Sequence, residues 1–323
     1  MLAANQDLLA RQWAIAKVLT KRPPRQRCMV CVSPLTGARS FVHRGVPYAF
    51  CGACGHLQCL ADPPLGYPSG QQDFGQIYPP LDAAVYRERT NRIYRPKLEW
   101  ALRVGAALGL GDLLARSWIE LGSGAGNFIA ALREAGAGQA GGLEADARLV
   151  RQAEEALGEP VVRHWRGSLA DAVAENPAEI YAAWFVLEHC FEIPQFLAAL
   201  RQRPTGTTFL FSVPMVGLGT LLESAFQSHF ARSLDSVLHL QLFTEDSVRH
   251  MLDQAGYEAK AEWLFGQDAD DLYRCLAARL AERGSTTVFH GEMERLAKVL
   301  SGLQQVLDRV RLCDARHVLA VKS

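Results

Sequence analysis

The alternation of apolar and polar positions through the middle of the chain predicts a parallel α/β sheet. Short apolar runs typical of strands alternate with stretches in which apolar residues recur at helical spacing. This alternation implies strands that run parallel, with helices on both faces of the sheet. The predicted strands lie near 117–121, 140–144, 161–164, 182–187 and 207–213, and the predicted helices near 126–136, 147–157 and 194–203.

Helix and strand signals continue on both sides of this region. Upstream, a long helix is expected from about residue 85, and Pro96 kinks it or resets its start. Downstream, Thr244 has the position of a helix N-cap, and Gly256 that of the glycine that ends the same helix. Further predicted elements are a helix over 1–20, a sixth strand over 257–264, helices over 268–283 and 291–312, and a last strand over 317–322.

The composition describes a globular chain of balanced charge. Of its 323 residues 49% are apolar, and 34 Lys and Arg balance 34 Asp and Glu. Such a neutral chain lacks the broad basic footprint of a nucleic-acid binder, although it leaves room for a local basic patch. No stretch approaches the roughly 20 consecutive apolar residues of a membrane span.

The first 20 residues are amphipathic rather than a secretory signal, because polar side chains interrupt any apolar centre. Basic residues follow over 21–27. We favour a docking helix followed by a basic loop, with a transit-like presequence or a membrane-surface helix as the alternative. The expectation is a cytoplasmic protein, and its oligomeric state stays open.

Four of the eight cysteines form two C-x-x-C pairs. Cys28 and Cys31 make the first pair, Cys51 and Cys54 make the second, and 19 residues separate the two pairs. In a long chain with no secretion signal this spacing favours metal over disulfides, and four thiolates close a tetrahedron around zinc. The residues between the pairs predict a hairpin and hence a zinc ribbon, whose closed site performs no catalysis. His56 is a spare candidate ligand.

The most informative motif is the glycine-rich run from Glu120 to Phe128, Glu-Leu-Gly-Ser-Gly-Ala-Gly-Asn-Phe. It follows an apolar strand and opens a helix, the layout that brings backbone amides against a nucleotide-like ligand. A dinucleotide fingerprint needs its third glycine at position 127, where Asn127 stands. The run instead resembles motif I of the class I S-adenosylmethionine-dependent methyltransferases, whose cofactor has no pyrophosphate.

Two further motifs follow in the order typical of that family, and the resemblance covers roughly residues 85–265. Glu144 ends the next apolar segment, at the distance where Rossmann-type folds place the acid that binds ribose hydroxyls. Glu188 and His189 come directly after a buried strand, and ligands of open α/β sheets bind at the carboxyl ends of strands. The resemblance implies a Rossmann-like class I methyltransferase sheet, with the last strand as its antiparallel edge.

The resemblance also implies which residues surround the cofactor. The three glycines of the run line the methionine side of S-adenosylmethionine, with Glu120 close by, and Glu144 binds the ribose. The usual adenine-side acid after the third strand is missing, and Ser168 or a backbone amide substitutes for it. The complete set of expected cofactor residues is Glu120, Gly122, Ser123, Gly124, Gly126, Asn127, Glu144 and Ser168.

Two histidines and a glutamate are the candidate catalytic residues. Methyl transfer requires that the acceptor be aligned with a positively charged sulfonium and, for most acceptors, that a proton be removed. Histidine is the natural base near neutral pH. His189, just past the fourth strand, is the first choice, and His239 is the second. Glu188 orients the histidine or faces the cofactor.

A zinc ribbon ahead of a methyltransferase core is also similar to the sugar C-methyltransferases that act on nucleotide-linked deoxysugars. In that group the zinc module helps to shape the acceptor side, a role for which Tyr78 and Tyr86 are candidates here. The group carries a Tyr-His-Glu-His run where this chain has Ser-Val-Leu before His239, so the tyrosine and the glutamate are absent. Ubiquinone-pathway O-methyltransferases are similar at the Glu-His pair, but Phe185 replaces a further glutamate, so no catalytic cation is expected.

The sequence therefore predicts an S-adenosylmethionine-dependent methyltransferase with a structural Zn²⁺ site and a small-molecule acceptor. A sugar, or another intermediate of polysaccharide or natural-product synthesis, is favoured, and the methylated atom (O, N or C) stays open. The alternatives are RNA or protein methylation through the zinc ribbon, and a non-catalytic module that binds partners. The expected segments are an N-terminal helix and basic loop (1–27), a zinc ribbon (28–60), a linker (61–84) and a methyltransferase domain (85–323) with a helical insertion near 266–312.

Overall fold

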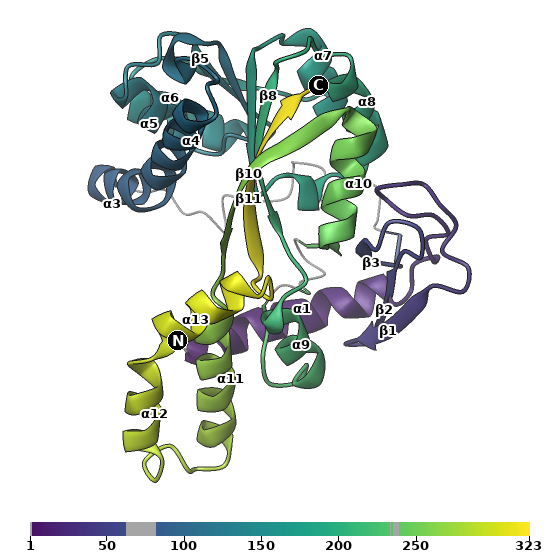
Figure 1. Ribbon diagram of the computed structural model, residues 1–323. Coiled ribbons are helices and arrows are strands. Elements are labelled where there is room, and N and C mark those ends of the chain that lie inside the picture. Colours follow the sequence, from purple (N-terminus) through teal and green to yellow (C-terminus); the bar gives the residue numbers. More distant parts are fainter. Residues whose placement is uncertain (1, 63–81, 233, 235–238) are drawn as a thin grey trace. The chain divides into compact units, whose positions relative to one another are not determined.

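The chain divides into two compact units in the computed structural model, which describes residues 2–62, 82–232, 234 and 239–323 (Figure 1). The first unit comprises Met1–Pro64, Val213–His250 and Trp263–His317, and the second comprises Leu65–Ser212, Met251–Glu262 and Val318–Ser323. The consecutive domains expected from the sequence are a different division and stay a prediction. Most of the expected linker, Tyr78 within it, and the Ser-Val-Leu run at 236–238 lie outside the described residues.

A seven-stranded sheet has the strand order β10-β11-β8-β7-β4-β5-β6. Parallel pairing joins β4 to β5 and to β7, β5 to β6, and β7 to β8, which confirms the parallel α/β sheet predicted from the sequence. Every residue of β7 and β8 is buried, as expected for strands covered on both faces. The strands are β4 Trp118–Leu121, β5 Ala140–Glu144, β6 Val162–His164, β7 Ile180–Trp184, β8 Thr208–Pro214, β10 Tyr257–Phe265 and β11 Ala315–Lys322.

The last strand is not the edge strand that the sequence led us to expect. β11 lies between β8 and β10, so β10 forms the edge. It does run antiparallel to β8, because the Lys322 amide donates to the Thr207 carbonyl at one end and the Met215 amide donates to the Asp314 carbonyl at the other. The side chains of β11 explain the inner position, since its first six residues are all buried.

The helices of the second unit begin and end within a few residues of their predicted bounds. The long helix expected from residue 85 is divided into α3, a π-helical turn η1 and α4, and Pro96 lies in the first turn of α4, where a missing amide costs nothing. The elements are α3 Ala83–Arg89, η1 Thr90–Tyr94, α4 Arg95–Ala107, η2 Leu113–Ala115, α5 Asn127–Glu134, α6 Ala147–Leu157, α7 Leu169–Glu175, η3 Leu187–His189 and α8 Ile193–Arg201.

The first unit contains a four-stranded antiparallel sheet of order β1-β2-β3-β9. The predicted hairpin is present as β1 Arg39–His43 and β2 Val46–Phe50, and its two turn residues both have positive φ, as a tight hairpin turn requires. Strand β3 (Leu57–Cys59) pairs with β9 (Gln241–Leu242), although 181 residues separate their ends. The cysteine-rich segment and the segment after β8 therefore fold as one sheet.

The remaining helices are α1 Leu2–Leu19, α9 Leu218–Ala225, α10 Glu245–Ala255, α11 Asp268–Glu282, α12 His290–Ala297 and α13 Leu300–Arg309. The single helix expected over 291–312 is in fact two, α12 and α13, which are interrupted at Lys298 and Val299. Thr244 does cap α10: its hydroxyl accepts from the Ser247 amide while its own amide donates to the Ser247 hydroxyl. Among the described residues, no helix has the length and apolarity to cross a membrane.

Candidate functional site

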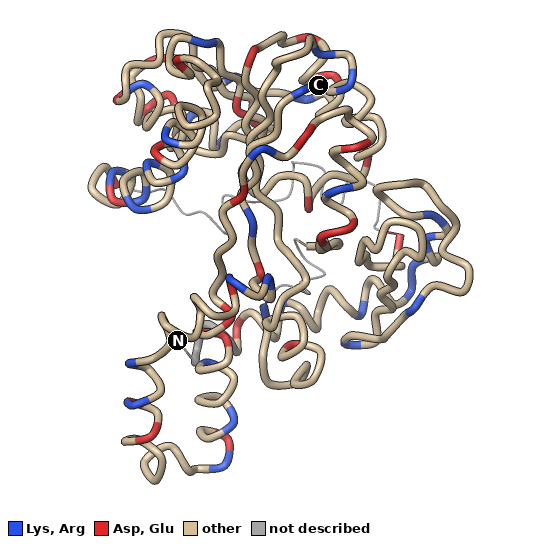
Figure 2. Tube along the Cα trace, in the orientation of Figure 1, with Lys and Arg blue, Asp and Glu red and all other residues tan. Residues whose placement is uncertain are grey.

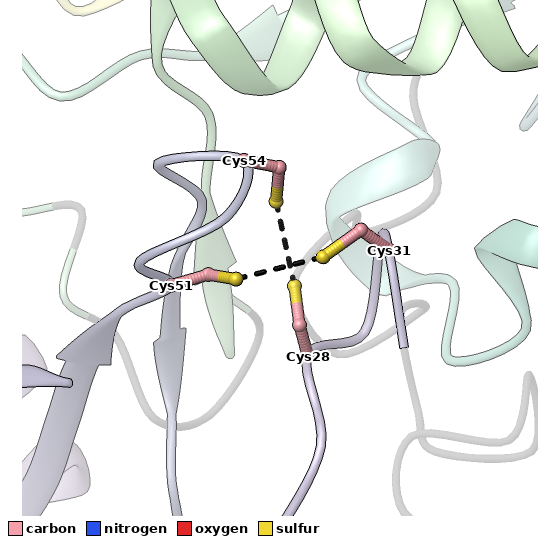
Figure 3. Close-up of side chains that lie close together, drawn as sticks. All are labelled: Cys28, Cys31, Cys51 and Cys54. Atoms are coloured by element: carbon pink, nitrogen blue, oxygen red, sulfur yellow. Dashed lines mark hydrogen bonds between the residues drawn. The ribbon is translucent and has the colours of Figure 1, made fainter. Parts of the chain in front are cut away.

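The four cysteines of the two C-x-x-C pairs converge in the first unit (Figure 3). Their sulfur atoms all lie within 4.8 Å of one another, with Cys28 and Cys54 3.6 Å apart and Cys31 and Cys51 3.5 Å apart. Zinc–sulfur bonds of about 2.3 Å put tetrahedral sulfur ligands about 3.8 Å apart, so this donor set fits zinc. The hydrogen bond between Cys54 and Cys28 lowers the pKa of Cys28 and raises that of Cys54, so without a metal the pair shares one proton.

The second cysteine loop is fastened to the segment that carries His239. The buried His56 lies within hydrogen-bond distance of Gln241, at 2.9 Å, rather than in the sulfur cluster, and its ring packs against Phe243. The Cys59 amide donates to the Leu240 carbonyl at 2.7 Å. His239 directly precedes these contacts. The cysteine loops thus hold the backbone on which this candidate catalytic residue lies.

In the second unit, the glycine-rich run forms the turn from β4 to α5. Gly122, Gly124 and Gly126 all have positive φ, between 55° and 75°, which side chains rarely adopt. The Gly122 amide donates to the Leu143 carbonyl, so the turn is fixed to the neighbouring strand. A Cβ on Gly122 would lie 2.8 Å from Val186, whereas a Cβ on Gly124 would meet nothing within 4 Å. The turn is packed at its start and accessible to a ligand at its middle.

Glu144 ends β5 opposite this turn. One carboxylate oxygen accepts from the Gly124 amide at 2.7 Å and the other from the Asp146 amide at 2.9 Å. Burial raises the pKa of Glu144, and these amides act in the opposite direction. Two backbone donors fix the direction of the carboxylate, and each oxygen keeps acceptor capacity for a ligand hydroxyl.

Glu120, the residue that opens the motif, is 2% exposed. Its Oε2 atom has no hydrogen-bond partner among the described residues. Burial raises the pKa of this carboxyl group well above its usual range, and the nearby Lys97 opposes the shift. The hydroxyl of Ser123, also buried, has no hydrogen-bond partner in the described part of the chain either. Buried polar atoms without partners are rare in native proteins and call for an explanation.

Two of the expected cofactor residues have structural partners. The side-chain amide of Asn127 donates to the Tyr86 carbonyl and to the Thr90 hydroxyl, which ties α5 to α3 and to the π-helical turn. Ser168 caps α7 in a reciprocal arrangement with Asp171. Tyr86 itself, proposed for the acceptor side, donates its hydroxyl to the Ala125 carbonyl of the glycine turn. The contacts of Asn127 and Tyr86 thus fasten the glycine turn and α5 to α3 and the π-helical turn, whereas that of Ser168 is internal to α7.

Glu188 and His189 lie in the short helical turn η3 that follows β7. Glu188 is 1% exposed, and burial raises its pKa to about 8. The His189 ring is partly exposed, and its Nε2 atom lies 4.0 Å from a carboxylate oxygen of Glu188. Phe185, at the end of the strand, has a φ of 56°, a strained value that redirects the chain here. The predicted strand over 182–187 therefore ends earlier, at Trp184.

One buried charge at this site was not among the sequence-based candidates. Lys97, on α4, is 5% exposed, and its ammonium lies over the rings of Tyr94, Trp184 and Phe185 at 4.8, 5.0 and 5.5 Å. The sequence does hold one indication that Lys97 is buried, namely its position on the predicted helix, because Lys97 follows Tyr94 by three residues and precedes Ala101 by four. It thus falls on the apolar face of the predicted helix.

One comparison with known proteins identifies the family. A family model described as a methyltransferase domain matches residues 86–262, more than half of the chain. Curated protein sequences gave no match. Similar solved structures include magnesium protoporphyrin IX methyltransferase from Synechocystis PCC 6803 with bound SAH, at 13% identity and a TM-score of 0.46, covering 77% of this chain and 93% of the other.

Two further solved structures are similar at the same level. A SAM dependent methyltransferase from Archaeoglobus fulgidus has 15% identity and a TM-score of 0.44, with coverage of 75% of this chain and all of the other. The cyclopropane synthase MmaA2 from Mycobacterium tuberculosis has 17% identity and a TM-score of 0.41, with coverage of 68% and 83%.

Proposed function

The chain belongs to the S-adenosylmethionine-dependent methyltransferases, and we propose that it methylates a small-molecule acceptor, namely a sugar or another intermediate of polysaccharide or natural-product synthesis. The observation that carries the cofactor assignment is the Glu144 carboxylate, held by two backbone amides across from a glycine turn. Such a carboxylate accepts hydrogen bonds from both hydroxyls of a ribose. When bound, S-adenosylmethionine supplies a methyl group on a positively charged sulfur atom.

The residues around the turn fit this cofactor in chemistry as well as in position. Glu120 offers a buried carboxylate oxygen without a partner, which suits a positively charged amino group. Ser123 offers a hydroxyl, and Gly124 leaves the middle of the turn free of side chain. Ser168 remains the sequence-based candidate for the adenine side, although its hydroxyl and its amide both bond to Asp171 in the cap of α7. Asn127 supports the turn through Tyr86 and Thr90.

For the acceptor side we propose His189 as the residue that takes the proton, with His239 as the alternative. The partly exposed imidazole of His189 is accessible to an acceptor, and the Glu188 carboxylate 4.0 Å away orients it or stabilises its protonated form. A base near a hydroxyl group of a sugar raises the nucleophilicity of the oxygen as the methyl group is transferred. The sugar assignment itself rests on the resemblance to the sugar C-methyltransferases.

We propose that the four-cysteine cluster binds one structural Zn²⁺ through Cys28, Cys31, Cys51 and Cys54. Four thiolates complete the tetrahedral coordination, so no position is open for a substrate. The contacts of His56 with Gln241, and of Cys59 with Leu240, support a role in holding the segment of His239. The metal then fixes the backbone that carries His239 and takes no part in the chemistry.

Titration calorimetry with S-adenosylmethionine tests the cofactor assignment. Replacement Glu144→Ala removes an ionised acceptor, and we expect affinity to decrease by about 30-fold or more. Glu155→Ala, an exposed glutamate on the adjacent helix α6, is the matched control and should bind as the wild type does. No binding by the wild type, or equal binding by the Glu144 variant, would remove the basis of the proposal.

Turnover with candidate acceptors tests the catalytic assignment. We expect methyl transfer to nucleotide-linked sugars, detected by mass spectrometry, and a decrease of about 100-fold or more for His189→Ala with unchanged cofactor affinity. If the rate of His189→Ala equals that of the wild type, the base is another residue, and His239→Ala is the next variant to measure. Methylation of RNA or protein but not of sugars would contradict the acceptor class.

A further inference from the structure

Two opposite charges are buried near each other where β4 and β7 end. Glu120 is the third residue of β4, and the paired strand β7 leads into Trp184 and Phe185, over whose rings the Lys97 ammonium lies. Glu120 and Lys97 interact electrostatically, and each opposes the pKa shift that burial produces in the other. Both belong to the same unit as the glycine turn.

Lys97 is a costly residue to bury. It is 5% exposed, and among the described residues no hydrogen bond or salt bridge reaches its ammonium, although three donor hydrogens are available. Three aromatic faces at 4.8–5.5 Å attract the charge, but they accept no full hydrogen bond. Burial accordingly lowers the pKa of Lys97 to about 8. An ammonium in this condition gains much from an anionic ligand.

Glu120 likewise has a buried polar atom without a hydrogen-bond partner among the described residues. Its Oε2 atom is buried without a partner, so it gains much from a positively charged donor. A single ligand group satisfies both residues if it carries an ammonium and a carboxylate on adjacent atoms. The free end of an amino acid has this chemistry, and so does the methionine end of S-adenosylmethionine.

We propose that Lys97 binds the carboxylate of the cofactor's amino-acid end, while Glu120 binds its ammonium. This assignment rests on the proposed function. Its charges balance: Lys97, Glu120 and Glu188, when ionised, sum to −1, and S-adenosylmethionine carries one carboxylate and two positive groups. Arg89 on α3 is the other cation that acts on Lys97, and Tyr94 on the π-helical turn faces it with its ring. α4 is therefore part of the cofactor site.

Binding measurements with three ligands separate this role from a structural one. S-adenosylmethionine and S-adenosylhomocysteine both carry the carboxylate, and decarboxylated S-adenosylmethionine lacks it. For Lys97→Met we expect the affinity for the first two ligands to decrease by about 10- to 100-fold, with the affinity for the third unchanged. Lys97→Arg keeps a cation and should retain most of the affinity for all three.

The control variant is Arg92→Met, which removes an exposed cation from the same helical region. Among the described residues, Arg92 pairs only with Glu88. It should bind all three ligands as the wild type does. Affinities come from calorimetry and, independently, from the ligand-dependent rise in melting temperature. Because decarboxylated S-adenosylmethionine binds without the carboxylate, its affinity also reports whether Lys97→Met is folded.

Equal losses of all three ligands in Lys97→Met would overturn the assignment and leave Lys97 a structural residue. Unchanged affinity for S-adenosylmethionine in this variant would overturn it as well. In both cases the wild type still binds the cofactor, so the proposed function stands. Failure of the wild type to bind any of the three ligands would instead overturn the proposed function, and the assignment of Lys97 with it.

Discussion

At the scale of single residues, the glycine turn shows why neighbouring glycines are needed for different reasons. Gly122 has a φ of 64° and is packed against Val186, so a side chain there is both strained and crowded. Gly124 has a similar φ but no neighbour on its Cβ side. Packing and backbone conformation both explain the first glycine, whereas backbone conformation alone explains the second, whose open side leaves space for a ligand.

The buried carboxyl groups link cofactor binding to protons. Burial raises the pKa of Glu188 to about 8, so its carboxyl group is largely protonated at neutral pH before binding, and burial also raises the pKa of Glu120 well above its usual range. A cationic ligand favours the ionised form, so binding at pH 7 releases protons and the affinity increases as the pH rises towards about 8. Above that pH, Lys97 loses its proton, and the affinity for the cofactor no longer increases with pH.

Calorimetry at pH 7 in buffers of different ionisation enthalpy measures this proton release. Glu188→Gln cannot lose a proton, so it should release fewer protons per bound cofactor than the wild type does. Proton uptake by the wild type would contradict the predicted release, and equal release by both proteins would show that the protons do not come from Glu188.

At the scale of elements, the pairing of β3 with β9 joins the cysteine loops to the segment after β8. Zinc binding supplies about 10–16 kcal/mol in small zinc modules, which are unfolded without the metal. We therefore expect that chelation of the metal makes the amides of β9 (Gln241–Leu242) exchange with solvent faster, together with those of residues 28–60. The glycine turn, in the other unit, should keep its protection.

Hydrogen exchange with mass spectrometry measures this, with an expected loss of protection of about 100-fold or more in the first unit's small sheet. Cys28→Ser should reproduce the effect of chelation. Cys313→Ser, which changes a buried cysteine of the same unit outside the cluster, should not. Chelation that loosens residues 28–60 but leaves β9 protected would mean that the cysteine loops do not hold β9.

Element boundaries were predictable where the signal is local. The glycine after α10, the cap at Thr244 and the proline at the start of α4 all act within one helical turn, and the helices begin and end near them. The position of β11 was not predictable from its own residues. Its place inside the sheet depends on two partners that lie 50 or more residues away in sequence, and its apolar run is compatible with any buried position.

At the scale of the whole molecule, balanced charge argues for a small acceptor. Lys and Arg alternate with Asp and Glu along most of the chain (Figure 2). The exception is residues 17–62, with seven Lys or Arg and one Asp, the local patch that an RNA acceptor needs. We expect kcat/KM to change by less than about tenfold between 50 and 200 mM salt, whereas an acceptor held by 6–10 phosphate contacts would lose about 10³–10⁵-fold. A loss of that size would favour RNA.

The sequence by itself determined the features whose partners are close along the chain or follow a fixed spacing. These are the strand–turn–helix of the glycine motif, the alternation that makes a parallel sheet, and the two cysteine pairs, because backbone geometry and metal coordination permit few spacings. Only the tertiary structure decided which distant groups meet. Lys97 lies over Trp184 and interacts electrostatically with Glu120, and Gln241 contacts His56. These pairs are 23 to 185 residues apart, and burial brings such groups together without leaving any periodic pattern.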